Sequence, residues 1–88
     1  MGCRLAEVGR TTIHTPESHQ LTGLLRELRV KAGLTQVELS TRLKRPQSFV
    51  SKVERGERRL DLVELRQVCQ ELGVDVVAVV REWTNRLG

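Results

Sequence analysis

The chain has 88 residues, a formal net charge of +4 and 39% hydrophobic residues, which suits one domain with a small core. No apolar run is long enough to span a membrane, and residues 1–20 lack the hydrophobic centre of a signal peptide, so we expect a cytoplasmic protein. The size leaves no room for a second domain that binds a small-molecule effector, and nothing in the sequence calls for a cofactor.

The first helix is expected to begin after Thr15 and to end at Ala32. Thr15-Pro16-Glu17 reads as a cap, a first helical residue and an acidic first turn, and leucines recur with helical spacing from Leu21 to Leu28. Residues 1–14 show no such stripe. We predict that residues 1–14 are flexible or extended, with the alternative that a strand around Ile13 pairs with a partner chain, and that residues 15–88 form the folded domain.

Two short helices joined by a tight turn are predicted next, over residues 36–43 and 46–54. Thr35 and Glu38 have the spacing of a capping box, and Pro46 stands where the first residue of the second short helix belongs. Gly56 supplies a residue that readily adopts the left-handed conformation that ends a helix. The pair has the form of a helix-turn-helix.

Two further helices complete an all-α prediction. Asp61 and Glu64 again fit a helix start, and one apolar face is formed by Leu62, Leu65, Val68, Cys69 and Leu72 before Gly73 ends the helix. Residues 74–80 are β-branched enough to form a strand. However, Asp75 is a good cap, and Val76, Val80, Trp83 and Leu87 continue at helical spacing. We therefore expect five helices and no strand.

Basic charge is concentrated around the second short helix. Residues 42–59 hold seven basic side chains against two acidic ones, a local charge of +5 that exceeds the +4 of the whole chain. Such a concentration indicates a polyanionic partner, and double-stranded DNA fits a helix-turn-helix.

Residues 34–56 resemble the helix-turn-helix of phage repressors, Cro and the small bacterial regulators of the XRE or lambda-repressor-like family. The matching segments are Gly33-Leu34-Thr35-Gln36, Glu38-Leu39, Pro46-Gln47-Ser48 and Val50-Ser51-Lys52-Val53-Glu54-Arg55-Gly56. The resemblance extends from about residue 21 to residue 83. It implies a five-helix lambda-repressor-like DNA-binding domain. One departure is Lys44, where the family usually has glycine, and a left-handed lysine would cost roughly 1 kcal/mol.

The resemblance also implies which side chains read the bases. The family's reading positions are occupied by Gln47, Ser48 and Lys52, and Ser51 lies close enough to serve as well. A glutamine can pair with adenine, a serine with either base, and a lysine with guanine. The alternative is that these residues are only the solvated face of a short helix.

Phosphate contacts are expected from residues around this helix. The resemblance places Gln36 on a phosphate. Arg55, Arg58 and Arg59 follow the helix in a loop, and Arg45 precedes it. Because Arg45 is a poor N-cap, the first backbone N–H groups of the helix are expected to be free to bind a phosphate. The resemblance further implies a structural ion pair between Arg29 and Glu54.

These features predict a sequence-specific transcriptional repressor that binds an inverted repeat as a homodimer through residues 46–54. Val77, Trp83 and Leu87 of the last helix are the expected dimer contacts, the alternative being that this helix packs only within its own chain. A restriction-modification controller or an antitoxin would use the same chemistry. A protein-interaction module that no longer binds DNA is a different class, and the basic charge argues against it.

Enzyme activity and a metal site are not expected. His14 and His19 are too sparse for metal binding, and no nucleophile, base and orienting carboxylate are spaced as a triad. Cys3 and Cys69 are expected to be free thiols in a reducing compartment.

Overall fold

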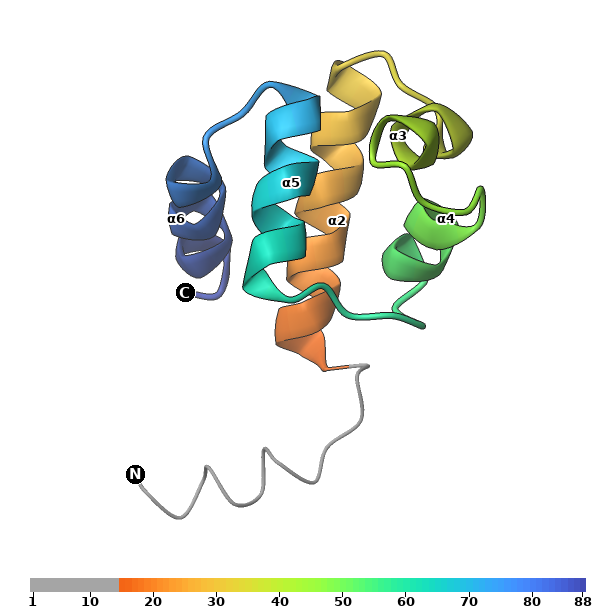
Figure 1. The fold of residues 1–88 in the computed structure, drawn as a ribbon. Coiled ribbons are helices and arrows are strands. Elements are labelled where there is room, and N and C mark those ends of the chain that lie inside the picture. The colour runs from red at the N-terminus through yellow and green to blue at the C-terminus, as the bar shows by residue number, and fades with distance from the viewer. Residues whose placement is uncertain (1–14) are drawn as a thin grey trace.

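The computed structural model describes residues 15–88, which fold into five helices and contain no strand (Figure 1). The helices are α2 (Pro16–Lys31), α3 (Gln36–Arg42), α4 (Phe49–Glu54), α5 (Leu62–Leu72) and α6 (Val76–Arg86). The all-α prediction is confirmed for this part of the chain. The predictions made for residues 1–14, including Cys3, Ile13 and His14, fall outside the described residues.

Side-chain caps explain where most of these helices begin. Thr35 and Glu38 form a capping box at α3, and Asp61 and Glu64 form a second one at α5. The Asp75 carboxylate accepts a hydrogen bond from Ala78 N, at 3.2 Å, at the start of α6. Each cap satisfies backbone donors that a helix cannot satisfy itself, so these starts are specified by local sequence.

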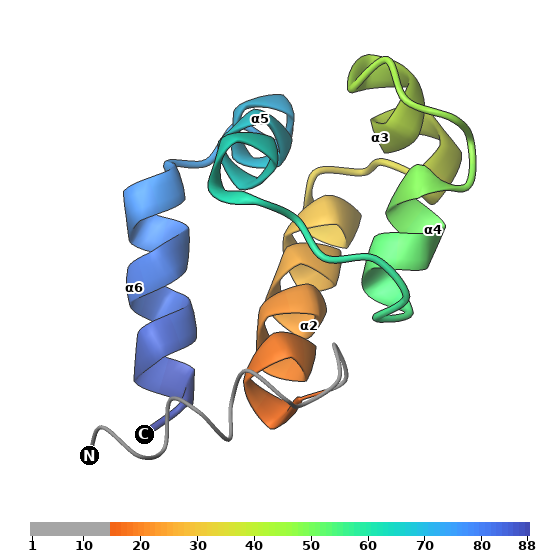
Figure 2. The same cartoon turned by 60° about the horizontal axis from the view of Figure 1, so that its bottom comes forward.

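Helix α2 lies at the centre of the domain, with α3 and α4 on one side and α5 and α6 on the other (Figures 1 and 2). A single cluster of buried side chains from all five helices and the turn before α3 forms the core. Its members are Leu24, Leu25, Leu34, Leu39, Phe49, Val50, Val53, Leu65, Val68, Cys69, Leu72 and Val79. Helix α4 is short, and three of its six residues belong to this core, so packing rather than helix propensity holds it.

The C-terminal half of α6 is attached to α2. The Trp83 indole Nε1 donates to the backbone oxygen of Glu17 at 2.8 Å, and Arg86 forms an ion pair with Glu27 at 2.9 Å. Trp83 also packs against the core. Trp83 therefore helps to hold α6 against α2, and because its side chain is only partly buried, the dimer contact expected from the sequence stays a prediction.

Cys69 is a free thiol and is only 1% exposed in the core of the domain. The pKa of this thiol is raised, mainly because the side chain is buried. Cys69 therefore stays protonated and acts as a small apolar side chain.

Lys44 has a left-handed backbone, with φ of 58°, in the turn after α3. A left-handed backbone was expected at this position because the resembled family usually has glycine there. Its backbone N–H donates to Thr41 O at 3.0 Å, and the next residue, Arg45, donates to Ser40 O at 3.0 Å, so the turn satisfies the last carbonyls of α3.

Replacing Lys44 with glycine is expected to raise the free energy of unfolding by about 0.5–1 kcal/mol, because glycine removes the left-handed strain and this gain exceeds its entropic cost. Urea denaturation would measure the change. Arg42→Gly is the control, since Arg42 lies in α3 and glycine there should cost about 1 kcal/mol. Equal destabilisation by both variants would show that the turn is not strained.

Candidate nucleic-acid interface

Helix α4, the second helix of the helix-turn-helix, begins at Phe49, not at Pro46 as the sequence predicted. Pro46 starts a turn that closes with a hydrogen bond from Phe49 N to Pro46 O, at 2.9 Å. The buried Ser40 of α3 fixes this geometry: its hydroxyl donates to Gln47 O at 3.3 Å and accepts from Val50 N at 3.1 Å. A side chain from the preceding helix therefore decides where α4 starts.

These bonds also correct the expectation that the first backbone N–H groups of α4 are free to hold a phosphate. Phe49 N donates to Pro46 O, and Val50 N donates to the Ser40 hydroxyl. Both donors are used inside the domain, so neither the Phe49 nor the Val50 amide is free to bind a phosphate.

The residues expected to read bases lie just before α4 and along it. Gln47, Ser48 and Lys52 are exposed. Ser48 has helical backbone angles, and Lys52 N donates to Ser48 O at 2.9 Å, so these two side chains share one helix face. Ser51 is half-buried, and its hydroxyl accepts from Arg55 at 2.7 Å.

The ion pair expected between Arg29 and Glu54 is present in the structure. The Arg29 and Glu54 side chains are only 10% and 7% exposed, and Arg29 Nε lies 2.7 Å from the carboxylate. Arg29 Nη1 also donates to Leu34 O at 2.7 Å, and Gln36 Nε2 donates to Glu54 at 2.9 Å. The pair therefore ties the end of α4 to α2 and to the start of α3.

Arg45 and Arg58, both expected to bind phosphates, converge on Phe49 and Glu64. Each guanidinium carbon lies 5.0 Å from the centre of the Phe49 ring. Glu64 Oε2 accepts from Arg45 at 2.9 Å and from Arg58 at 2.7 Å. We call these four residues the Phe49 cluster. The hydrogen bonds from Arg58, and next the bond from Asp61 N, lower the pKa of Glu64 from 4.5 to about 2.

Sequence reasoning missed this cluster. Glu64 fits a capping box, and that role alone accounts for its position in the sequence. Arg45 is 19 residues from Glu64, and no local pattern links two residues so far apart.

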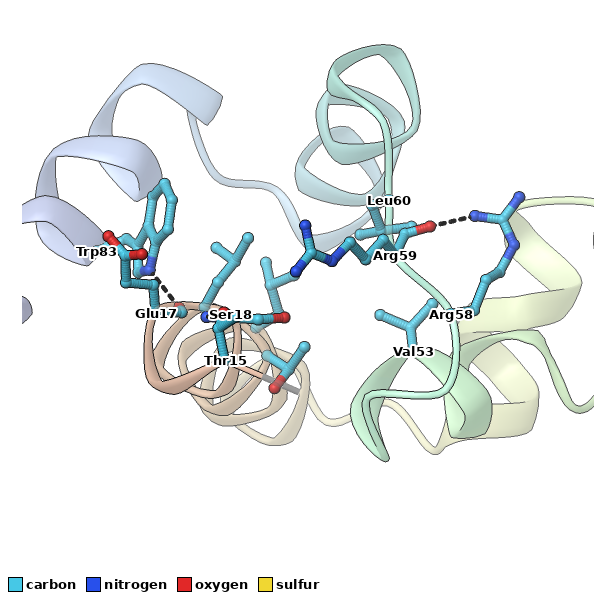
Figure 3. A pocket seen from close by; sticks show the side chains of 11 residues that line it. Thr15, Glu17, Ser18, Val53, Arg58, Arg59, Leu60 and Trp83 are labelled. Atoms are coloured by element: carbon cyan, nitrogen blue, oxygen red, sulfur yellow. Dashed lines mark hydrogen bonds between the residues drawn. The ribbon is translucent and has the colours of Figure 1, made fainter. Parts of the chain in front are cut away.

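Arg55 and Arg59 occupy different positions in the loop that follows α4. Arg55 forms an exposed pair with Glu57 at 2.7 Å. Arg59 extends toward α2 across a cavity of about 250 Å³, between the first turns of α2, the loop and Trp83 (Figure 3). The guanidinium group of Arg58 lies on the opposite side of the loop and donates to the backbone oxygen of Arg59. The predicted phosphate-binding arginines therefore do not form one continuous row.

An apolar groove lies between the first turns of α5 and α6. It is lined by Leu62, Val63, Arg66, Val76, Val77 and Val80. Leu62 is 73% exposed, Val63 67% and Val77 57%. The assignment of Leu62 to the core face is thus wrong, whereas Val77 is exposed as a dimer contact requires. Leu87 is 39% exposed and lies just after α6, outside the groove.

Comparison with known proteins supports the same reading of the fold. A family model described as a helix-turn-helix domain matches residues 20–83. An XRE-family like protein from Pseudomonas syringae pathovar tomato is 45% identical, with a TM-score of 0.78 over 86% of this chain and 93% of that chain. The chain belongs to the XRE family of helix-turn-helix proteins.

Two other solved structures resemble this XRE-family domain. The clp gene regulator ClgR from Corynebacterium glutamicum is 28% identical, with a TM-score of 0.73 over 82% of this chain and 77% of that chain. The restriction-modification controller protein C.Esp1396I is 19% identical and shares the fold, with a TM-score of 0.76 over 84% of this chain and 97% of that chain. A search of curated proteins found no match.

This XRE-family chain is thus a helix-turn-helix DNA-binding regulator. Within residues 15–88, no helix is both long and apolar enough to cross a membrane. The same residues include no group of three or more histidine, cysteine, aspartate or glutamate side chains placed to hold a metal ion.

Proposed function

We propose that this XRE-family protein is a sequence-specific transcriptional repressor that acts in the cytoplasm and binds an inverted-repeat operator as a homodimer. The observation that carries the proposal is that Gln47 and Ser48, just before α4, and Lys52, within it, are all exposed. These side chains offer hydrogen-bonding groups to base edges, and the buried side of α4 holds them on a rigid core. Ser51 can join them once Arg55 turns to a phosphate.

Phosphate binding is assigned to Gln36, Arg45, Arg55, Arg58 and Arg59. The pair between Arg55 and Glu57 is about half exposed on both sides, so exchanging it for a phosphate costs little. Gln36 donates one amide hydrogen to Glu54 and keeps a second one, which can reach a phosphate without breaking that bond.

The homodimer part of the proposal rests on the apolar groove between α5 and α6. One domain reads only a few base pairs, and two copies with reading helices roughly 34 Å apart are the usual solution. A second copy of this chain would cover Leu62, Val63 and Val77, which are otherwise exposed apolar side chains at one site. Leu87 can contribute only at the edge of such an interface.

A restriction-modification controller is the second candidate. C.Esp1396I, which shares this fold at 19% identity, has been solved as a tetramer in complex with its natural 35-base-pair operator. A controller or an antitoxin would bind DNA through the same face as a repressor. An endonuclease or toxin reading frame next to the gene would favour these alternatives.

Selection from a random duplex library at near-physiological salt tests the proposal. The purified protein should enrich an inverted repeat, and the spacing of the half-sites would report the dimer geometry. Weak, salt-sensitive binding without enrichment would contradict sequence-specific recognition and would favour a protein-interaction role.

Substitutions should separate base reading from phosphate binding. Gln47→Ala and Lys52→Ala are each expected to relax the preference at one base pair by about 1–3 kcal/mol. Arg55→Ala should weaken binding to all duplexes and reduce the salt dependence by about one unit. Binding titrations against single-base variants of the selected duplex would measure both effects. A uniform loss from Lys52→Ala would reassign Lys52 to a phosphate.

A further inference from the structure

Glu64 lies between two parts of the domain that have separate roles in the proposed function: the arginines beside α4 and the apolar groove between α5 and α6. Its Oε1 accepts from Asp61 N at 3.0 Å, and its own backbone N–H donates to Asp61 at 2.7 Å, which closes the first turn of α5. The same carboxylate accepts from Arg45 and Arg58 beside α4. The intervening residues, Leu62 and Val63, lie in the apolar groove. The first turn of α5 therefore contributes residues both to the groove and to the Phe49 cluster beside α4.

The two arginines of the Phe49 cluster are paired with Glu64 but remain partly exposed to solvent. Their side chains are each 38% exposed, whereas that of Glu64 is 10% exposed. Phe49, the first residue of α4, is buried and provides the ring against which both guanidinium groups lie. Two cations with one carboxylate leave one net positive charge next to the start of α4. Arg45 donates to Glu64 through Nη2 alone, so its other N–H groups can meet a phosphate.

We propose that Glu64 is a positioning residue for DNA binding, which holds Arg45 and Arg58 over Phe49 so that both guanidinium groups are in place for phosphates before DNA arrives. The inference rests on the proposed function. A long arginine side chain loses rotamer freedom when it binds a phosphate, and a side chain that is already ordered loses less. Because the carboxylate lies in the turn of α5 that borders the groove, the same residue fixes these arginines relative to the proposed dimer face.

Glu64→Gln tests the inference, because glutamine keeps one oxygen for the capping box but loses the charge and the second acceptor. The probes are the inverted-repeat duplex from the selection and a scrambled duplex of equal length. We expect the ratio of the two affinities to fall about tenfold, because correctly placed arginines fit the phosphates only in the register of the specific complex, whereas binding to the scrambled duplex depends mainly on net charge, which Glu64→Gln does not reduce. Binding to the scrambled duplex should stay the same or increase, since a negative charge near the phosphates is removed. Glu27→Gln, which removes the partner of Arg86 on α2, should leave the ratio unchanged.

A double-mutant cycle distinguishes positioning from a purely structural role. If Glu64 acts through the arginines, Glu64→Gln should have no further effect on the ratio when Arg45 and Arg58 are both methionine. A purely structural role would lower the thermal unfolding midpoint and leave the ratio unchanged at temperatures where both proteins are folded. If Glu64→Gln does not fold, Phe49→Leu replaces it, because loss of the ring should lower the ratio in the same direction.

The outcomes separate the inference from the proposed function. A wild-type protein that selects no duplex contradicts the proposed function itself. A wild-type protein that selects an inverted repeat, combined with an unchanged ratio in Glu64→Gln or in its replacement Phe49→Leu, overturns the positioning role and leaves the proposed function intact.

Discussion

Replacing Val77 with lysine is expected to convert the protein to a monomer and to weaken binding to the selected inverted repeat by at least about 100-fold. Val77 is 57% exposed in the groove between α5 and α6, so lysine fits the folded monomer without strain. In a dimer that covers this groove, however, the new charge would be desolvated, and it would lie in the same groove as Arg66, a like charge. The loss of affinity follows because two linked half-sites bind far more tightly than one.

Sedimentation analysis and duplex titration would measure these two effects together. Val30→Lys is the matched control: Val30 is 61% exposed on α2, outside the groove, and the substitution adds the same positive charge. The control should remain dimeric and bind at least as tightly as the wild-type protein. A dimeric Val77→Lys variant would show that the groove is not the interface between copies.

Replacing Arg29 with methionine is expected to lower the free energy of unfolding by about 3 kcal/mol or more. The substitution leaves the Glu54 side chain, only 7% exposed, with the hydrogen bond from Gln36 but without its cation, and it removes the Arg29 donor from Leu34 O. A buried charge that loses its partner costs far more than the pair contributes when intact. For a domain of this size, such a loss is a large part of the total stability.

Urea denaturation of three variants would test this explanation. Arg86→Met removes two ion pairs, to Glu27 and Glu82, whose side chains are 57% and 51% exposed, and it should lower the free energy of unfolding far less than Arg29→Met does. The double variant Arg29→Met with Glu54→Leu removes both buried charges and should recover much of the loss. Similar costs for Arg29→Met and Arg86→Met would mean that burial does not control the strength of these pairs.

Local sequence accounts for most helix boundaries. Thr35 with Glu38, and Asp61 with Glu64, are three residues apart, and each pair closes its bonds within one turn. Asp75 also ends the ambiguity over the β-branched residues 74–80, because its cap and the apolar spacing that follows belong to a helix. The left-handed turn at Lys44 was expected from the position of the turn and is present in spite of the side chain.

Residues distant in the sequence determine where α4 starts and which acceptors the arginines on either side of it contact. The Ser40 hydroxyl accepts a hydrogen bond from the backbone N–H of Val50, ten residues away. The helix therefore starts at Phe49, whereas the sequence predicted a start at Pro46. Arg45 was predicted to bind a phosphate, and in the structure it donates a hydrogen bond to Glu64, 19 residues away in the sequence. Charge composition shows how many cations a segment has, but not which of them are already paired.

The sequence by itself thus determined the five helices, the helix-turn-helix and the family, because capping bonds and apolar spacing act over a few residues. The tertiary structure alone decided that Leu62 faces outward, that Trp83 is bonded to α2, and that Glu64 holds two arginines over Phe49. These features arise from the relative placement of whole helices. A pattern within one helix specifies which stripe is apolar. Only the neighbouring helices decide which residues at the edge of that stripe are buried and which charged side chains form ion pairs.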